Sequence, residues 1–476
     1  MDFPYGKAAL AILLLAILSG AGVWWAEASA ARRRPDLVFA TFTKEHAAAY
    51  KPAVEEFEKQ HNVTVQVQVV SQRALQSRLQ AAMQAGADVP DMVELLYGTL
   101  GFFTRGPVDQ VGFVDLTDRA RSEGLFDSLV GSRFGQWSTR GRLFAIPHDV
   151  HPVMLAYRRD LVEQLGIDVA ALTTWEAFCR VGREVVTKDL DGDGVIDRYM
   201  LDLPADGADA LRLLILQRGA AIFDEQGDVA FDDERTLEVI CWYVRQVQGS
   251  ERIAFPCGWG QTLSRAMIDG LCLFYICPDW RTKQIEVDIP SLRGKLAVMP
   301  LPAWEASGLR TSVWGGTGLA IPKQGRNFEL AWKLANHLYF DREDLGERFR
   351  ATNILPPLME AWNDPAFNEP NEYWGGIRIG RVYAELAPNT PEERSSPYMS
   401  LAIGKLSEVY TSASLYHAKH GEDGLREYTR AELKRGAARV REIIERNRFL
   451  RPTASPRGAG EREQAIDTPT KEAPSP

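Results

Sequence analysis

Cysteine is scarce in this sequence and absent from its N-terminal part. The five cysteines among 476 residues are Cys179, Cys241, Cys257, Cys272 and Cys277. They form no Cys-x-x-Cys pair and no His/Cys spacing of a zinc site. An odd number leaves at least one thiol unpaired within the chain. We expect buried free thiols, with one disulfide as the alternative.

Motifs of common enzymes and nucleic-acid-binding proteins are missing as well. The sequence has no Gly-x-Ser-x-Gly elbow, no His-Glu-x-x-His helix and no glycine-rich phosphate loop after a strand. The net charge is −9, and no long basic stripe is present, which argues against a nucleic-acid surface. We therefore expect that the protein is not an enzyme and does not bind nucleic acid.

An uncharged apolar run, residues 8–25, follows Lys7 near the N-terminus. Ala28-Ser-Ala30 offers the small residues of a cleavage site. The run is longer than that of a typical signal peptide, and three arginines at 32–34 follow on the side that would cross the membrane. We expect export, with residues 1–31 as a signal peptide or a signal anchor. This places the protein in the periplasm or at the outer face of the cytoplasmic membrane.

Most of the remaining sequence alternates between expected strands and helices. Strands are expected at residues 37–42, 63–70 and 91–96, with helices between them at 47–60 and 73–85. Such a series forms a mainly parallel sheet that is covered by helices on both faces. Ligands of these sheets bind outside the carboxyl ends of the strands, so Tyr97, directly after the third strand, is a candidate pocket residue.

The segment Phe144–His151 predicts a passage between two lobes. A strand stops at Pro147, an apolar strand follows from Met154, and a helix begins after Thr174 as its N-cap. A chain that leaves one sheet at a proline and enters another connects two lobes. The order "FAIP", apolar strand, "YRRDL" and "TWEAF" resembles the hinge-crossing segment of bacterial extracellular solute-binding proteins of family 1. These are the carbohydrate-binding components of ABC importers and are similar to maltose-binding protein.

Later segments carry the same resemblance in the family's order, so that it covers most of residues 36 to 450. They are a helix closed by Gly270 with an apolar strand and Trp280, the Trp314-Gly315-Gly316 turn, and Tyr373-Trp374-Gly-Gly. Two departures put ligand contacts in doubt. Pro278-Asp279 stands where the family has a small residue and a glycine or proline, and Ile377 replaces a glutamine.

The resemblance implies a sugar site between the lobes. Trp280, Trp314, Tyr373 and Trp374 would offer apolar faces to sugar rings, and the indole N–H of Trp280 would be left free to donate. Gly315 and Gly316 would let backbone N–H groups approach the hydroxyls, because no Cβ intervenes. The polar partners would be His148, Asp149 and Asp279. Packing of each tryptophan at a lobe edge and a plain tight Gly-Gly turn are the alternatives.

The implied fold is a two-lobed α/β fold of the type II periplasmic-binding-protein class, with the ligand cleft between lobes joined by several crossings. The first lobe would comprise residues 36–148 and 298–340, and the second 149–297 and 341–450. Residues 451–476 are rich in Pro, Ser, Thr, Glu and Gly, so we expect a disordered tail.

The resemblance also implies a function. The protein would capture a sugar or oligosaccharide as a monomer and deliver it to the membrane subunits of an ABC importer, without a required cofactor. One alternative is a membrane-tethered sugar sensor or scaffold. The other is a glycoside-acting enzyme, with Glu94 and Asp149 as paired carboxylates or with His148, Asp149 and His151 as an acid–base or metal group.

The segment 188–199 carries a calcium-loop pattern. Asp189, Asp191, Asp193 and Asp197 stand at positions 1, 3, 5 and 9 of such a loop, and the Val195 carbonyl at position 7. Met200 stands where the bidentate acid of position 12 is usual. The segment is therefore either a structural calcium site or a solvated Asp-Gly turn.

Overall fold

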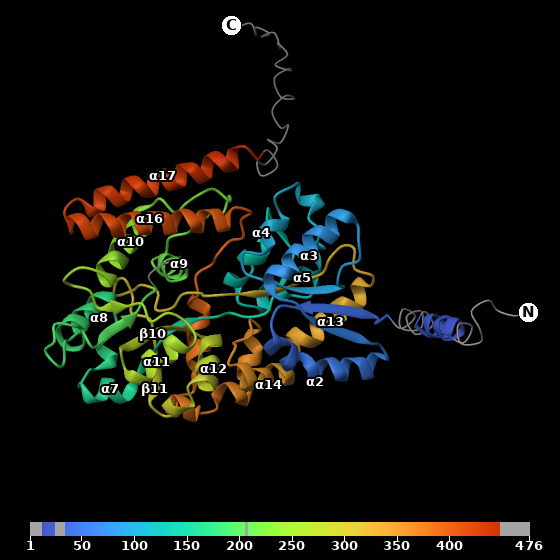
Figure 1. Cartoon of the computed structure of the whole chain (residues 1–476), viewed down its shortest axis with the longest axis horizontal. Coiled ribbons are helices and arrows are strands. Elements are labelled where there is room, and N and C mark those ends of the chain that lie inside the picture. The colour runs from blue at the N-terminus through green and yellow to red at the C-terminus, as the bar shows by residue number, and fades with distance from the viewer. Residues whose placement is uncertain (1–11, 24–33, 205–207, 448–476) are drawn as a thin grey trace, which may run out of the picture.

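The computed structural model describes residues 12–23, 34–204 and 208–447 and shows two lobes side by side (Figure 1). Residues 12–23 form an exposed helix. Within the described residues, no helix is both long enough and apolar enough to span a bilayer. The rest of the expected signal segment, residues 1–11 and 24–31, and the expected tail 451–476 lie outside the described residues.

The first lobe is built on a five-stranded sheet of order β2-β1-β3-β12-β6. β1 (Leu37–Thr41) runs parallel to β2 (Val65–Val69) and β3 (Met92–Leu96), while β12 (Thr317–Ala320) pairs antiparallel with β3 and with β6 (Ile146–Pro147). The connecting helices are α2 (Lys44–His61) and α3 (Gln72–Ala85). The expected β-α-β-α-β series is confirmed, with boundaries shifted by a few residues.

Side-chain chemistry explains where α2 begins and how it packs. The Thr43 hydroxyl accepts the backbone N–H groups of Glu45 and His46, which satisfies two donors of the first turn. The apolar face of the helix buries Tyr50 and Phe57 against the sheet. A later helix of the lobe, α13 (Phe328–Phe340), packs on α2.

The second lobe has its own five-stranded sheet, of order β11-β7-β10-β8-β9. Its central strand β10 (Cys272–Pro278) is buried along its whole length between β7 (Val153–Arg158) and β8 (Tyr199–Asp202). At the edges lie β9 (Ala254–Phe255) and β11 (Leu296–Pro300). A strand buried on both faces requires a continuous apolar run, as the sequence of β10 has.

Helices cover this second sheet on both sides. Thr174 caps α8 as expected, because its hydroxyl accepts the Ala177 N–H at 3.2 Å. The long helices α16 and α17 form an antiparallel pair along the outer side of the lobe (Figure 1). The covering helices are α8 (Trp175–Val181), α9 (Ala208–Gln217), α10 (Glu234–Val247), α11 (Gln261–Asp269), α12 (Asp279–Asp288), α16 (Met399–His420) and α17 (Leu425–Glu445).

Within the described residues, three passages connect the lobes: the β6–β7 segment, the β11–β12 segment and the segment that follows α14. Two expected boundaries need correction. β11 pairs with β7 in the second sheet, so the chain returns to the first lobe at β12 and not at residue 298. Helix α14 (Arg342–Thr352) spans the boundary expected at 341, because Leu345 packs in the core of the first lobe and Phe349 packs in a cluster with residues of β7, β10 and β11. Pro278 is the N-cap of α12, which begins at Asp279.

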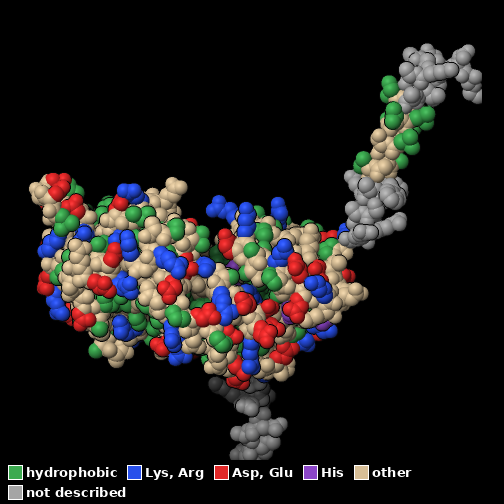
Figure 2. Space-filling model, turned by 90° about the horizontal axis from the view of Figure 1, so that it is seen from below, with side chains coloured by type: hydrophobic (Ala, Val, Ile, Leu, Met, Phe, Trp, Pro, Cys, Tyr) green, Lys and Arg blue, Asp and Glu red, His purple; other side chains and the backbone are tan. Residues whose placement is uncertain are grey.

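The cysteines agree with the sequence analysis, in which buried free thiols are expected. All five cysteines are buried and free, with the sulfur atoms of Cys257 and Cys272 3.3 Å apart. Acidic and basic side chains are interspersed over the face seen in Figure 2, which shows no continuous basic stripe.

Candidate functional site

A cavity of about 680 Å³ lies between the lobes at the carboxyl ends of β1, β3 and β10. Both lobes and the β11–β12 passage contribute to it, as expected for a crevice at strand ends. The residues that line it include Glu45, His46, Tyr97, His151, Asp209, Trp259, Trp280, Lys283, Asp288, Trp314, Gly315, Gly316 and Thr317. Another cavity, of about 640 Å³, lies between residues 138–141 and 224–229, and it contains no tryptophan.

Three tryptophans form one wall of the cavity. The ring centroids of Trp280 and Trp314 are 6.0 Å apart with planes at 80°, and those of Trp259 and Trp314 are 5.7 Å apart at 75°. Edge-to-face pairs of this kind are favourable and fix the ring orientations. Trp314 is buried, whereas Trp259 is 51% exposed. Trp259 and Trp280 therefore offer the accessible aromatic surface.

The indole nitrogen of Trp280 is not free, contrary to expectation. It donates a hydrogen bond of 2.9 Å to the backbone carbonyl of Trp314. Trp280 lies in the first turn of α12, and the bond holds its ring against the β11–β12 passage. Trp280 can thus present its ring face to a ligand, but its N–H is already used within the protein.

The glycine pair at 315–316 is required by neighbouring side chains. Gly315 and Gly316 have φ angles of 111° and 146°. A Cβ on Gly316 would lie 2.3 Å from Oε1 of Gln136, and one on Gly315 would lie 3.0 Å from the His151 ring. Both glycines line the cavity. They let the passage run close to the buried polar groups behind it.

Tyr97 reaches across the cavity from the first lobe to the second. Its hydroxyl donates to Asp209 at 3.2 Å, and the Arg212 guanidinium lies 4.7 Å from the ring centroid. Burial raises the pKa of Tyr97 to about 12, and the nearby Asp209 carboxylate adds to the rise. The phenol therefore remains a neutral donor.

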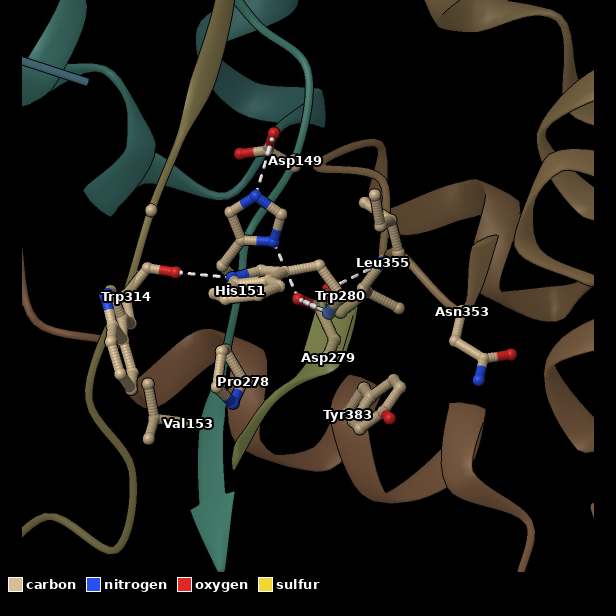
Figure 3. A network of polar contacts seen from close by, with 12 residues as sticks. Asp149, His151, Val153, Pro278, Asp279, Trp280, Trp314, Asn353, Leu355 and Tyr383 are labelled. Atoms are coloured by element: carbon tan, nitrogen blue, oxygen red, sulfur yellow. Dashed lines mark hydrogen bonds and ion pairs between the residues drawn. The ribbon is translucent and has the colours of Figure 1, made fainter. Parts of the chain in front are cut away.

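His148, Asp149 and Asp279, expected as polar ligand contacts, do not line this cavity. Asp149 and Asp279 are 1% and 0% exposed. They flank the imidazole of His151: its Nε2 lies 3.0 Å from Asp149, and its Nδ1 lies 2.6 Å from Asp279 (Figure 3). Asp149 lies in the crossing that the sequence predicted, and Asp279 lies directly before Trp280 at the start of α12. Both carboxylates are buried and pair with His151.

The electrostatics of this cluster follow from burial and pairing. Burial alone would lower the pKa of His151, but the two carboxylates outweigh it and raise that pKa to about 10. Burial would raise the pKa of Asp149, whereas His151 and the His148 hydrogen bond hold it well below its usual range. Both nitrogens of His151 are occupied, so the imidazole has no lone pair for a metal.

The carboxylate pair considered for glycoside chemistry is also occupied. Glu94 is fully buried and accepts hydrogen bonds from Thr41, Tyr50 and Tyr339, while Nδ1 of His46 lies 3.1 Å away. Burial would raise its pKa, but His46 lowers it to about 2. Neither Glu94 nor Asp149 lines the cavity.

Tyr373 and Trp374 do not lie at the cavity, which corrects the expectation. Trp374 is 0% exposed, and its indole N–H donates to Glu286 at 3.0 Å. The Tyr373 hydroxyl donates to the Ile289 carbonyl at 2.6 Å. Both rings belong to the core behind α12. Without the family's glutamine, this turn is a packing element.

The sequence analysis missed two kinds of cavity residue: those with a signal in the sequence and those that only the folded helix brings to the cavity. Trp259 stands between Gly258 and Gly260, an aromatic-glycine turn much like the one at Trp314, and this signal was available. Glu45 follows the carboxyl end of β1, so the strand-end rule that selected Tyr97 applies to it as well. Lys283 and Asp288 follow Trp280 on α12, and only the helical geometry brings them to the cavity.

The Asp-Gly loop at 189–197 is exposed on the second lobe. Carboxylate oxygens of Asp189, Asp191 and Asp197 lie within 4.8 Å of one another. Each also accepts loop backbone N–H groups, for example Gly192 and Gly194 on Asp189. Asp193 caps the Val195 N–H, and Val195 is exposed. The loop satisfies its own donors, and calcium binding there stays a prediction.

Comparison with known families agrees with this architecture. A model of the bacterial extracellular solute-binding protein family matches residues 40–343, and the chain belongs to this family. The family expected from the sequence motifs is thereby confirmed.

Two curated relatives are arabinooligosaccharide-binding proteins. The protein from Halalkalibacterium halodurans is 25% identical over 346 residues, which cover 71% of this chain and 75% of that protein. The protein from Bacillus subtilis is 22% identical over 414 residues, which cover 86% of this chain and 93% of that protein. Both named relatives are binding proteins.

Solved structures share the fold. The sugar-binding protein MalE from Xanthomonas citri has a TM-score of 0.67 at 18% identity, covering 86% of this chain and 99% of that chain. A cyclo/maltodextrin-binding protein in complex with maltotetraose has a TM-score of 0.64 at 20% identity, covering 87% and 98%. The two-lobed α/β class expected from the sequence is confirmed.

Proposed function

We propose that the protein is an exported carrier that binds a short neutral oligosaccharide in the interlobe cavity and delivers it to an ABC importer. The observation that carries this proposal is the tryptophan wall of the cavity. It is formed by Trp259, Trp280 and Trp314, which belong to separate segments of the chain. Aromatic faces suit the C–H surfaces of sugar rings. Both curated relatives are named as arabinooligosaccharide-binding proteins, which supports the same ligand class.

The size and charge of the cavity favour a neutral ligand. About 680 Å³ falls in the range of roughly 300–1,000 Å³ that is usual for small-molecule sites. Three carboxylates, Glu45, Asp209 and Asp288, line the cavity together with Lys283 and the protonated His151. Carboxylates accept hydrogen bonds from hydroxyls and repel anions.

Transport requires binding without chemistry. A ligand that contacts both lobes favours the closed arrangement by the difference in its affinity for the closed and open forms. The importer's membrane subunits would read the closed form at the outer face of the cytoplasmic membrane. The carrier would act as a monomer, and a retained N-terminal segment would anchor it there.

A thermal-shift screen tests the proposal. The panel contains arabinotriose, maltotetraose, galactobiose and their monosaccharides, with a uronic-acid oligosaccharide as the anionic control. A neutral oligosaccharide should raise the melting temperature in a concentration-dependent way, because only the native state binds it. The bound sugar should be recovered unchanged by chromatography. No shift with any neutral sugar, or cleavage of the sugar, contradicts the proposal.

A further inference from the structure

The three passages between the lobes contact one another directly behind the cavity. The His148 N–H of the β6–β7 passage donates at 2.9 Å to the carbonyl of Thr317, where the β11–β12 passage enters β12. Two residues further on, the Val150 N–H donates to the Leu355 carbonyl of the third passage at 3.0 Å. Any relative movement of the lobes must pass through these short segments.

One side chain occupies the centre of this arrangement. The His151 imidazole lies between the Asp149 carboxylate at 3.0 Å and the Asp279 carboxylate at 2.6 Å (Figure 3). Exposure of these three residues is 5% or less. Two carboxylates buried on either side of one imidazole need its positive charge, since unpaired buried charges are costly.

Each carboxylate in turn holds backbone groups of the other passages. Asp149 accepts the Thr317 N–H, at 3.0 Å for the nearer oxygen. Asp279 accepts the Leu355 N–H at 2.8 Å and the Trp280 N–H at 2.7 Å. One imidazole thus connects all three passages and the first turn of α12, on which Trp280 lies.

The backbone of His151 is itself held in an unfavourable conformation. Its φ angle is 57°, in the left-handed region that only a few per cent of non-glycine residues adopt. Such a residue persists only where its surroundings fix it, and conformations of this kind cluster at functional sites. Here the turn directs the ring between the two carboxylates (Figure 3).

We propose that His151 is a positioning residue, which holds the three passages in one arrangement and thereby orients Trp280 toward the ligand. The proposal rests on the proposed function in one respect, namely that Trp280 contacts the sugar. The tie between the passages is a property of the free protein and can be measured without any ligand.

Hydrogen exchange of the free protein tests the tie. The variant is His151→Asn, because asparagine tolerates the left-handed backbone but cannot bridge two carboxylates. Peptides with the N–H groups of Thr317, Trp280 and Leu355 should exchange about tenfold faster or more, while β1 stays protected. His61→Asn, an exposed histidine at the end of α2, is the matched control and should leave all four segments unchanged.

Two results of this exchange experiment would contradict the proposal that His151 holds the three passages together. Unchanged exchange at Thr317, Trp280 and Leu355 means that His151 does not hold the passages. Equal acceleration in all peptides, β1 included, means that His151 acts through global stability alone.

A double-mutant cycle tests the orientation of Trp280. With arabinotriose as the probe, or the best sugar of the thermal-shift panel, His151→Asn should weaken binding about tenfold. In the Trp280→Ala background the same substitution should cost less than about twofold, because the residue it positions is gone. The role of His151 in orienting Trp280 is overturned if His151→Asn weakens binding by the same factor in both backgrounds. It is also overturned if the His151→Asn single variant binds with full affinity.

The two failures are distinguishable. If no sugar binds the wild-type protein, the proposed function fails, and the exchange experiment alone decides whether His151 ties the passages. If sugar binds and both variants behave independently, the proposed function stands and the positioning role of His151 is wrong.

Discussion

The indole N–H of Trp280 donates to the backbone carbonyl of Trp314 at 2.9 Å, while the two rings meet edge to face. One residue belongs to α12 of the second lobe, and the other to the passage that returns to the first lobe. The tryptophan wall is therefore assembled across the hinge, and its geometry depends on how the passages are held.

Removing the Trp280 ring should weaken sugar binding strongly. Loss of a large aromatic platform costs about 3 kcal/mol or more by analogy with core truncations, so Trp280→Ala should reduce affinity about a hundredfold or more. Isothermal titration with the best oligosaccharide of the panel measures this. Because the ring is partly exposed, the fold should persist in circular dichroism. Unchanged affinity would show that the ring only packs at the lobe edge.

Trp374 should behave in the opposite way. Its ring is fully buried and bonded to Glu286, so Trp374→Phe should lower the free energy of unfolding by about 2 kcal/mol, through the lost hydrogen bond and packing. Sugar affinity should stay the same, because the residue does not line the cavity. Chemical denaturation and titration of the same preparation measure both quantities. A large loss of sugar affinity with an unchanged free energy of unfolding would show that Trp374 belongs to the binding site.

The stability of the protein should fall at alkaline pH through His151. Its pKa rises from 6.5 to about 10 on folding, so the folded state binds the proton more tightly. The stabilisation is complete below pH 6.5 and is lost as the pH rises through about 10. The groups around the ring are Asp149, Asp279, His46, His148 and Arg133.

Thermal melts across this pH range measure the effect by difference. The melting temperature of the wild type should fall more steeply between neutral pH and about 10 than that of His151→Asn. Tyrosine ionisation affects both proteins alike and cancels in the comparison. Identical slopes would mean that the imidazole is not protonated in the folded state.

Calcium should act on stability and not on sugar binding. If Asp189, Asp191 and Asp197 hold an ion, a chelator should lower the melting temperature and added calcium should restore it. Asp191→Asn should mimic the chelator while sugar affinity is retained, since this loop is not part of the cavity. An identical melting temperature with and without chelator would mean that the loop is a solvated Asp-Gly turn without bound calcium.

The sequence predicted the fold well because the fold depends on local patterns. The alternation in β2, the apolar run of β10 and the cap at Thr174 are properties of neighbouring residues. The lobe boundary near residue 298 was wrong, because the sheet that β11 joins depends on its distant partner β7.

The site was harder to predict from the sequence because it depends on which way side chains point. Tyr97 reaches the cavity, as the strand-end rule suggested, and Trp280 and Trp314 reach it, as the resemblance implied. Asp149 and Asp279 point inward to His151. The contact between His151 and Asp279 joins residues that are 128 positions apart in the sequence. Trp374 lies in the core, and its indole N–H donates to the partly buried carboxylate of Glu286.

The central claim is that the interlobe cavity binds an intact oligosaccharide through the tryptophan wall. The most direct measurement is isothermal titration of arabinotriose into the wild type and into the Trp259→Ala/Trp280→Ala double variant, followed by chromatography of the sugar. The predicted result is saturable one-to-one binding by the wild type, loss of binding by the folded double variant, and unchanged sugar. Equal binding by both proteins, or shortened sugar, would contradict the claim.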